Sequence, residues 1–464
     1  MPDDPHAVSV CLPLWSHNIA YEEHDPEVVD RLQAAYPRFC LHPAVRRLCD
    51  HMFSNGIGLP FVSHNAARRA SAYVAFHGGT SAKIVSITGQ LCAGVSVKQD
   101  EFPLLRQYWQ HAGEIVSSRM AERMIDGLPV QFSETAARST TRQRVADLHM
   151  TTPDNVFLFA SGMAAIAAVW RAATRLAPGR PTCQFAFPYV DTLNIQQRFP
   201  GAAHEFLPAG TDADLQTLRN RISDWRFAAV FSETPTNPLL VTPDLQQLAN
   251  LSRTHQSLLI VDDTLRACSG SSILPYCDAV TTSLTKYFSG YGNVLAGALT
   301  LNPELPHFSD LRSAVTGDFE ETLSDADAEI LERNSRDLDD RVSQSNRNTF
   351  LLVDRLKSHP AVESVFYPSS NESDKAGCGS LFSVVLRNPE QNTPPVFDAL
   401  QICKGPNLGT NFTLCCPYTI LAHYNELDFA ERCGVSRWLL RFSVGMEPAE
   451  ELWERIERAL SLAE

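Results

Sequence analysis

Residues 278–290 read DAVTTSLTKYFSG, and this stretch decides the fold. A strand predicted over Ala279–Ser283 passes from apolar to polar residues and leads into a glycine-bearing loop that carries Lys286. Residues 258–264 read LLIVDDT and end a second, buried-looking strand at Asp262, which precedes Lys286 by 24 positions. Successive parallel strands that are joined by a short crossover repeat at about this spacing. The spacing therefore predicts that the carboxylate and the amine lie at the same edge of one sheet.

This pair of side chains suits pyridoxal 5′-phosphate (PLP). The amine of Lys286 would form the Schiff base, and the carboxylate of Asp262 would keep the pyridine nitrogen protonated. The hydroxyls of Ser283 and Thr285 would meet the phosphate. Taken alone, Lys286 would be read as an ordinary surface residue, and the matching position of Asp262 is what favours the cofactor.

Composition restricts the class of protein. The 464 residues, 44% of them hydrophobic, can fill two or three packed units. A formal net charge of −14 argues against nucleic-acid and anionic-membrane partners. Twelve scattered cysteines without a Cys-x-x-Cys motif favour free thiols in a reducing cytosol over a zinc site or a disulfide framework. The acidic, proline-broken start and the lack of a long apolar run complete the prediction of a soluble, cytoplasmic protein without a metal.

The pattern along the chain predicts three parts. Residues 1–60, rich in aromatics and proline with little periodicity, are expected to form an N-terminal arm. Residues 61–305 end in a strand–helix alternation that predicts a parallel α/β sheet, with an insertion over about 61–150. Residues 306–464 form a C-terminal domain, in which the acidic stretch 318–332 reads as a solvated connector. The expected elements are strands at Cys183–Phe187, Phe227–Ser232, Leu258–Asp262 and Ala279–Ser283 and helices at Met163–Leu176, Leu338–Lys357 and Ala449–Leu462.

Other polar side chains stand where strands end or a helix begins. Ser161 precedes an Ala-rich helix whose free N–H groups, together with Gly162, could seat a phosphate, although a plain N-cap is the alternative. Tyr189 could stack on a cofactor ring or be a core aromatic, and Asn237 lies in a proline-locked turn that could be an ordinary one. Arg441, inside an apolar strand, needs an internal carboxylate or a substrate carboxylate as its partner. Each of these patterns is weak evidence for a cofactor site when taken alone. Together, in an order along the chain that fits one such site, they are strong evidence.

These segments resemble the Cys/Met-metabolism PLP enzymes, namely the cystathionine γ-synthase group and most closely its fungal branch. The resemblance spans nearly the whole chain and implies the PLP-dependent transferase fold type I, which is aspartate aminotransferase-like. This α/β fold has a large domain with a parallel or mixed sheet and a smaller C-terminal α/β domain. The specific segments are residues 187–192 (FPYVDT), 233–238 (ETPTNP), 283–290 (SLTKYFSG), 331–337 (LERNSRD) and 440–447 (LRFSVGME).

The resemblance also implies a role for each site residue. Lys286 would be the catalytic Schiff-base lysine, and Asp262 the partner of the pyridinium. Tyr189 would be a second catalytic residue that stacks on the ring, Asn237 would bond the phenolic oxygen, and Arg441 would bind the substrate α-carboxylate. The residues expected at the phosphate are Ser161, Gly162, Met163, Ser283 and Thr285, together with Tyr36 and Arg38 from a neighbouring subunit. The resemblance therefore implies a homodimer or homotetramer with shared active sites.

The chain departs from the family pattern at several positions. The family's Tyr-Gly-Gly-Thr reads Tyr-Val-Asp-Thr from Tyr189, and its Ser-Leu-Gly reads Asn-Leu-Gly from Asn407. Tyr291 follows Gly290 where many relatives carry a Gly-His. The shorter bacterial members have no counterpart of residues 60–150, although the fungal branch has a similar insertion. These departures leave substrate choice open, because Asn407, Tyr291 and the arm would line the substrate side.

The predicted reaction is γ-replacement on an O-activated homoserine, either O-acetyl- or O-succinyl-homoserine. Cysteine as the second substrate would give cystathionine. The first alternative is a carbon nucleophile, such as a β-keto acid, in secondary metabolism, and a γ-lyase is the next. A non-catalytic PLP-fold scaffold is the last alternative, and the intact Lys286, Asp262 and Arg441 argue against it.

Overall fold

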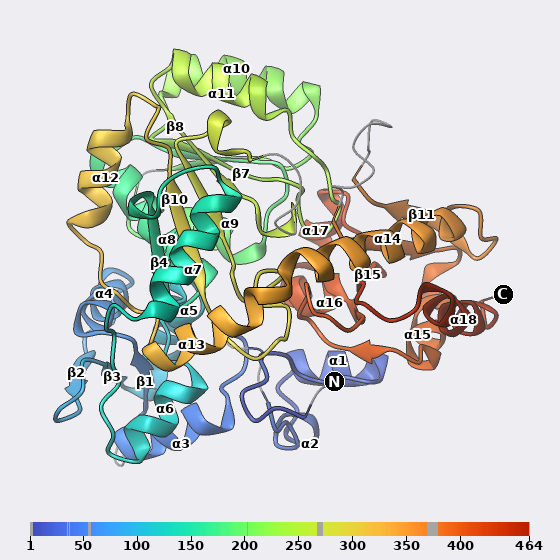
Figure 1. Cartoon of the computed structure of the whole chain (residues 1–464), viewed down its shortest axis with the longest axis horizontal. Coiled ribbons are helices and arrows are strands. Elements are labelled where there is room, and N and C mark those ends of the chain that lie inside the picture. Colours follow the sequence, from blue (N-terminus) through green and yellow to red (C-terminus); the bar gives the residue numbers. More distant parts are fainter. Residues whose placement is uncertain are drawn as a thin grey trace.

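The computed structural model describes residues 3–34, 36, 38–53, 57–201, 203–266, 272–368 and 379–463. Figure 1 shows a large sheet with helices on both faces, a second sheet near the C-terminus, and a small sheet built by the insertion. Within these residue ranges, no helix is long and apolar enough to cross a membrane.

The large sheet has seven strands in the order β4-β10-β9-β8-β7-β5-β6. Five neighbouring strands, from β9 to β6, run parallel, whereas β10 runs antiparallel to both β4 and β9. The predicted α/β sheet is therefore confirmed, and it is mixed. Its strands are β4 (Val156–Phe159), β5 (Thr182–Phe185), β6 (His204–Leu207), β7 (Ala229–Glu233), β8 (Leu258–Asp262), β9 (Ala279–Thr282) and β10 (Gly297–Leu301).

Strand β8 supplies alternate side chains to two cores, one on each face of the sheet. Leu258 and Ile260 pack with the Ala-rich face of α8, whereas Leu259 and Val261 pack with α10 and α11. Because successive side chains point to opposite faces, a strand that is covered on both sides is apolar until it leaves the sheet, here at Asp262. The helices of this domain are α7 (Ala136–Leu148), α8 (Gly162–Leu176), α9 (Val190–Arg198), α10 (Asp212–Trp225), α11 (Leu245–Thr254) and α12 (Phe308–Thr316).

The arm and the insertion pack closely against the rest of the chain. Helix α1 buries Trp15, whose ring stacks on Trp438 at 5.5 Å, and α3 packs on α6 of the insertion. Around a three-stranded antiparallel sheet in the order β1-β3-β2, residues of the insertion form one core together with Ala44, Val45 and Leu48 of α3. The elements are α1 (Trp15–Glu22), α2 (Pro26–Val29), α3 (Pro43–Met52), β1 (Ile57–Phe61), α4 (His64–Phe76), β2 (Lys83–Ser86), β3 (Ala93–Val97), α5 (Phe102–Ala112) and α6 (Ser118–Ile125).

The C-terminal part forms a five-stranded sheet in the order β11-β12-β15-β14-β13. Helices α14 and α18 pack with strands of this sheet in one core. The helices predicted at Met163–Leu176, Leu338–Lys357 and Ala449–Leu462 are found, with at most two residues of difference at an end. The elements are α13 (Asp325–Asn334), α14 (Leu338–Lys357), β11 (Val362–Phe366), β12 (Leu381–Leu386), α15 (Pro389–Ala399), β13 (Cys403–Lys404), β14 (Leu414–Pro417), α16 (Tyr418–His423), α17 (Leu427–Arg432), β15 (Leu440–Ser443) and α18 (Ala449–Leu460).

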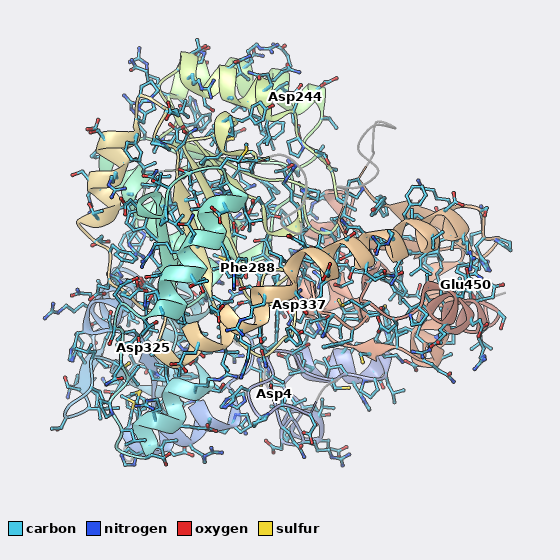
Figure 2. All side chains as sticks on the ribbon, viewed as in Figure 1. Asp4, Asp244, Phe288, Asp325, Asp337 and Glu450 are labelled. Atoms are coloured by element: carbon cyan, nitrogen blue, oxygen red, sulfur yellow. The ribbon has the colours of Figure 1, made fainter. Side chains whose placement is uncertain are left out.

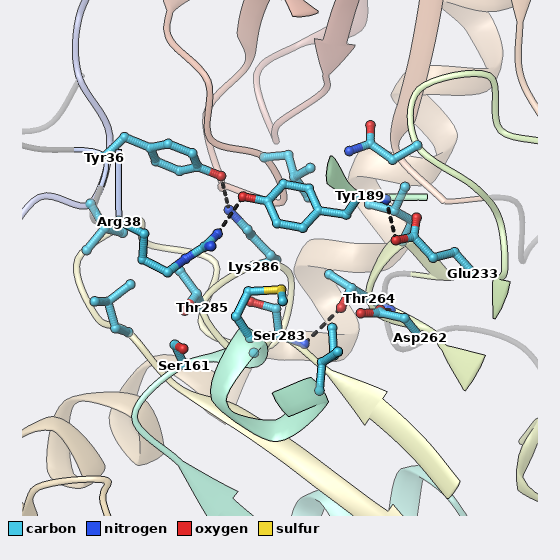
Figure 3. A pocket seen from close by; sticks show the side chains of 18 of the residues that line it. Tyr36, Arg38, Ser161, Tyr189, Glu233, Asp262, Thr264, Ser283, Thr285 and Lys286 are labelled. Carbon is cyan, nitrogen blue, oxygen red and sulfur yellow. Dashed lines mark hydrogen bonds between the residues drawn. The ribbon is translucent and has the colours of Figure 1, made fainter. Parts of the chain in front are cut away.

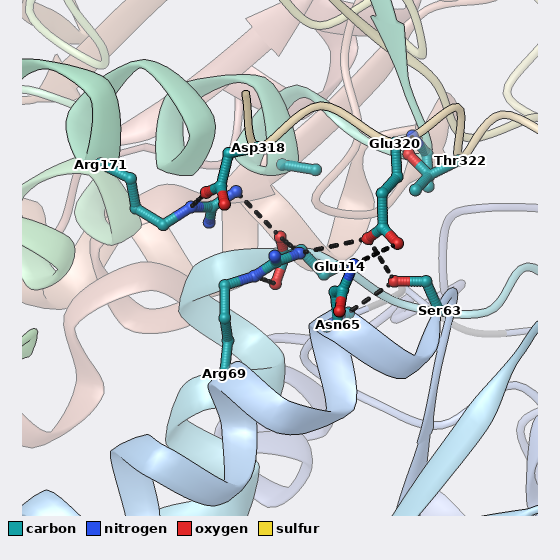
Figure 4. Close-up of polar contacts among 12 residues, drawn as sticks. Ser63, Asn65, Arg69, Glu114, Arg171, Asp318, Glu320 and Thr322 are labelled. Atoms are coloured by element: carbon teal, nitrogen blue, oxygen red, sulfur yellow. Dashed lines mark hydrogen bonds and ion pairs between the residues drawn. The ribbon is translucent and has the colours of Figure 1, made fainter. Parts of the chain in front are cut away.

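The solvated connector that was expected over residues 318–332 is not observed. Part of this stretch is helix α13, and its carboxylates pair with arginines from distant segments. Arg171 of α8 contacts Asp318 at 3.1 Å (Figure 4), and Arg138, whose side chain is fully buried, pairs with two other carboxylates of the stretch. The prediction failed because the partners of these acids lie more than a hundred residues away in the sequence.

A shared core joins the large domain to the C-terminal domain. Phe288, near the centre of the molecule (Figure 2), packs in a cluster with Ala298 of the large sheet. Leu338 and Val342 of α14 and Leu381 of β12 belong to the same cluster. The loop that carries Lys286 is therefore held between the two domains.

Candidate active site

The strands β7, β8 and β9 end at one edge of the large sheet, and a cavity with an empty volume of about 800 Å³ opens there (Figure 3). Twelve of the thirteen predicted site residues line it, and the remaining one, Asn407, contacts Lys286. The structure therefore brings the predicted residues together, while their chemical roles stay predictions. The twelve are Tyr36, Arg38, Ser161, Gly162, Met163, Tyr189, Asn237, Asp262, Ser283, Thr285, Lys286 and Arg441.

Lys286 projects its amine into this cavity. The Nζ atom donates to Tyr36 Oη at 3.0 Å and to Asn407 Oδ1 at 2.6 Å. Burial lowers the pKa of Lys286, and the nearby guanidinium groups of Arg441 and Arg38 lower it further, against the opposing effect of Tyr36. A lowered pKa raises the fraction of neutral amine, which is the form that attacks a carbonyl carbon.

Two carboxyl groups end neighbouring strands at this edge. Glu233 of β7 and Asp262 of β8 are partners in the parallel register. Burial, together with Asp262, raises the pKa of Glu233 well above its usual range, whereas the pKa of Asp262 is raised by burial only to about 6 because Thr264 donates hydrogen bonds to it. Asp262 is therefore the carboxyl group of the two that ionises more readily. An ionised Asp262 fits the protonated nitrogen of a PLP ring.

The first turn of α8 and the start of the lysine loop form a cradle on the opposite side. Ser161 caps α8 by accepting from Ala164 N, as predicted. A side chain at Gly162 could not fit, because its Cβ would lie 2.8 Å from Ser283 Cβ. The N–H groups of the first turn of a helix have no partner within that helix, so those of Gly162 and Met163 can receive an anion. These residues fit the phosphate of PLP.

The hydroxyl groups around this cradle are not equally available. Thr285 Oγ1 donates to Ala296 O and accepts from Ala296 N, and Ser161 Oγ donates to Gly113 O at 2.7 Å. Their protons are therefore engaged with the protein backbone. Among the described residues, Ser283 Oγ has no hydrogen-bond partner, so it is the hydroxyl best placed to donate to a phosphate.

The arm reaches the cavity of its own chain in this structure. Arg38 donates to Tyr189 Oη at 2.5 Å and forms a short ion pair with Asp191 (Figure 3 shows Arg38 beside Tyr36 and Tyr189). Its guanidinium also lies 5.3 Å from the centre of the Tyr189 ring. Delivery of Tyr36 and Arg38 from a neighbouring subunit stays a prediction, since one chain can place both residues in its own site.

Arg441 and Asn407 bring the C-terminal domain into the site. Arg441, 4% exposed, donates to Asn237 Oδ1 at 3.2 Å and to Pro406 O at 2.6 Å, and no carboxylate of the described residues pairs with it. Asn407 directly follows Pro406, and its Nδ2 atom is buried without a hydrogen-bond partner. An unpaired buried guanidinium and an unpaired amide N–H suit an external carboxylate.

Several residues at the site were not predicted from the sequence, among them the polar residues Glu233, Thr264 and Asp191. Glu233 Oε1 accepts from Tyr189 N at 2.5 Å, and the buried Asp191 holds Arg38. A signal for Glu233 was present, because it ends a predicted strand beside Asp262. Asp191 was noted only as a departure from the family glycine, and its partners come from distant segments.

A lysine, an ionised carboxylate and a helix N-terminus at the carboxyl edge of a mixed α/β sheet define a PLP-dependent enzyme of fold type I. The sequence profile of the Cys/Met metabolism PLP-dependent enzyme family matches residues 131–461, and the chain belongs to this family.

Named proteins are similar to this chain over nearly its entire length. A cystathionine gamma-synthase of Saccharomyces cerevisiae is 31% identical, with 100% of this chain and 98% of that protein covered. A cystathionine gamma-synthase-like protein, ankD, of Aspergillus thermomutatus is 32% identical over 99% of this chain and 93% of that protein. A crystal structure of a cystathionine gamma synthase from Xanthomonas oryzae pv. oryzae aligns with a TM-score of 0.63 at 24% identity, covering 71% of this chain and 86% of that one. The structural likeness supports the fold.

Proposed function

We propose that this enzyme catalyses γ-replacement on O-acetyl- or O-succinyl-homoserine with cysteine, in which the Cγ–O bond breaks, a Cγ–S bond forms, and cystathionine and acetate or succinate are released. The observation that carries the proposal is the buried Arg441, which lacks a carboxylate partner among the described residues and lines the same cavity as Lys286. Arg441 binds the substrate α-carboxylate and so presents its Cα to the lysine. PLP, when bound, supplies an electron sink for that carbon. The amine of Lys286 would move protons at Cα and Cβ of the substrate.

A smaller cavity beside the main one favours cysteine as the second substrate. Val8 and Leu295 line both cavities, and Arg119 and Asn293 line the smaller one. Cysteine brings its own carboxylate and ammonium group, which need polar partners beyond the reacting sulfur. Named relatives in yeast and Neurospora crassa are cystathionine gamma-synthases, which agrees with this choice.

A second candidate reaction uses a carbon nucleophile such as a β-keto acid. The shared wall of Val8 and Leu295, together with Leu408 in the main cavity, is apolar and would accept such a substrate. Relatives named only as synthase-like, in Aspergillus thermomutatus and Amanita muscaria, are as similar to this chain as the named synthases.

A competition experiment separates these reactions. The purified enzyme is incubated with O-acetyl-homoserine and equal concentrations of cysteine and acetoacetate, and the products are quantified by mass spectrometry. We expect cystathionine to predominate. A predominant carbon–carbon product would replace our proposal with the second candidate. Release of ammonia and a keto acid, without either addition product, would indicate a γ-lyase.

We further propose a homodimer or homotetramer in which Tyr36 and Arg38 of one subunit complete the site of its neighbour. The family resemblance supports this arrangement, and so does the distance in sequence between the arm and the lysine loop. Arg38→Ala and Lys286→Ala should each be nearly inactive. Mixed subunits should recover about a quarter of the wild-type activity, because half of the dimers would contain one intact site. No recovery after mixing and refolding would mean that the arm serves its own subunit.

We propose that the enzyme acts in the cytoplasm. No disulfide bond joins the cysteines that the structure describes, as expected in a reducing compartment. A fluorescent fusion protein should therefore stain the cytosol evenly, and concentration in an organelle would contradict the proposal.

A further inference from the structure

The last turn of helix α5, in the insertion, contacts residues that lie around the cofactor cradle. Gln110 O accepts from Arg38 Nη1 at 3.0 Å. His111 Nδ1 lies 2.7 Å from Asp191 Oδ1, and both side chains are buried. The terminal carbonyl groups of a helix have no partner within it, so the end of α5 is suited to receive a cation such as Arg38.

Asp191 holds the guanidinium of Arg38 from one side. Asp191 Oδ2 forms the ion pair with Arg38 Nη1. Asp191 Oδ1 lies within hydrogen-bonding distance of His111 Nδ1 and accepts from Gln110 Nε2 at 3.3 Å. Arg38 also donates to Tyr189 Oη at 2.5 Å. An arginine has five N–H donors. Three of those of Arg38 are used, for Asp191, Tyr189 Oη and Gln110 O. The other two remain for a ligand in the cavity that Arg38 lines.

The residues that follow α5 are in close contact with the N-terminus of α8. Gly113 has a φ of +65°, and a Cβ there would lie 2.5 Å from Ser161 Oγ and 2.7 Å from Met163 Cβ. Glu114, which is buried, pairs with Arg69 of α4 at 2.7 Å and with Arg171 of α8 at 3.2 Å (Figure 4). The salt bridge with Arg171 fixes the insertion to the helix whose first turn forms the cradle, whereas the one with Arg69 holds Glu114 within the insertion.

We infer that the insertion is a positioning element for the cofactor, in which His111 and Asp191 hold Arg38 in the orientation that binds the phosphate. The inference rests on the proposed phosphate role of Arg38, and it applies whichever subunit supplies that residue. Position 191 is a glycine in the family pattern, and His111 lies before the matched residues 131–461. The contact between them therefore joins a residue outside the matched profile to one that departs from the family pattern.

Two effects of Asp191 oppose each other. Its negative charge repels a phosphate, so its removal could strengthen binding, whereas loss of its grip on Arg38 would weaken binding. We expect the second effect to dominate, because Arg38 is itself buried and three protein acceptors define its geometry. Fixed, desolvated donors bind an anion better than mobile ones.

The test compares the binding of PLP with that of pyridoxal, which lacks the phosphate. Apo-protein is titrated with each compound, and dissociation constants are taken from the quenching of tryptophan fluorescence. His111→Ala and Asp191→Gly should raise the dissociation constant of PLP about ten-fold while leaving that of pyridoxal unchanged. Asp191→Asn keeps one acceptor for Arg38 and should lie between them and the wild type. His51→Ala, an exposed position in α3, is the matched control and should change neither constant.

Each contrary result has a distinct meaning. Tighter PLP binding in Asp191→Gly, or equal losses for PLP and pyridoxal, would overturn the inference. If Arg38→Ala does not change the PLP-to-pyridoxal ratio, the proposed phosphate role of Arg38 is wrong. If Arg38→Ala changes that ratio while His111→Ala and Asp191→Asn do not, only the positioning role is wrong. Circular dichroism identifies a variant that fails to fold. The remaining variants then decide whether His111 and Asp191 position Arg38.

Discussion

Lys286→Ala should lower turnover by a factor of roughly 10²–10⁴ or more while still binding PLP loosely. The substitution removes both the amine that carries the cofactor and the group that moves protons at the substrate. The half-buried position of Lys286, its lowered pKa and its contacts with Tyr36 and Asn407 are the observations behind this expectation. The rates of both proteins are measured with O-acetyl-homoserine and cysteine at saturating concentrations.

Borohydride reduction provides an independent check on the same residue. The wild-type protein should be yellow, and reduction should fix a pyridoxyl group on one peptide, the one that contains Lys286. Lys286→Arg keeps a positive charge but cannot carry the cofactor, so it should be as inactive as the alanine variant. Lys357→Ala, at an exposed position of α14, should retain full activity. A label on another lysine, or a protein that takes up no PLP, would refute the assignment.

Arg441→Ala should weaken the binding of the amino-acid substrate by about 2–5 kcal/mol, or roughly 30- to 4000-fold, because it removes one partner of a buried charge pair. The PLP spectrum and the melting temperature should remain nearly unchanged, since no carboxylate of the described residues depends on Arg441. Substrate dissociation constants are measured on the PLP-loaded protein by spectral titration.

A conservative variant distinguishes the anchor role of Arg441 from a structural one. Arg441→Lys keeps the charge but loses the planar, two-pronged geometry that matches a carboxylate, so it should recover only part of the affinity. If Arg441→Ala instead unfolds, or loses PLP with unchanged substrate affinity, then Arg441 has a structural role.

The strand ends were predictable from the sequence because they follow local rules. Apolar runs that stop at a polar residue mark where a buried strand leaves the sheet, and this rule located Asp262. The helix start at Ser161 was predictable for a similar reason, since a capping serine precedes the Ala-rich helix. The role expected of Arg38 came from the family resemblance. Arg441 stood out locally as a charge inside an apolar strand, and the resemblance favoured the substrate carboxylate over an internal one as its partner.

Contacts between distant segments could not be predicted from one sequence. The acidic stretch 318–332 contains no basic residue of its own, and its partner Arg138 lies 187 residues before Asp325. The same limit applies to Asp191 and His111, which are 80 residues apart. A single sequence without compared relatives does not reveal which distant charges meet.

The two sides of the site belong to different domains. Lys286 and Asn237 come from the large domain, whereas Asn407 and Arg441, which contact them, come from the C-terminal domain. Any rotation of one domain over the other at the core around Phe288 changes the separation between the amine and the guanidinium. The reach of the site, and with it the length of the amino acid that can bridge these two groups, is set by how the domains dock.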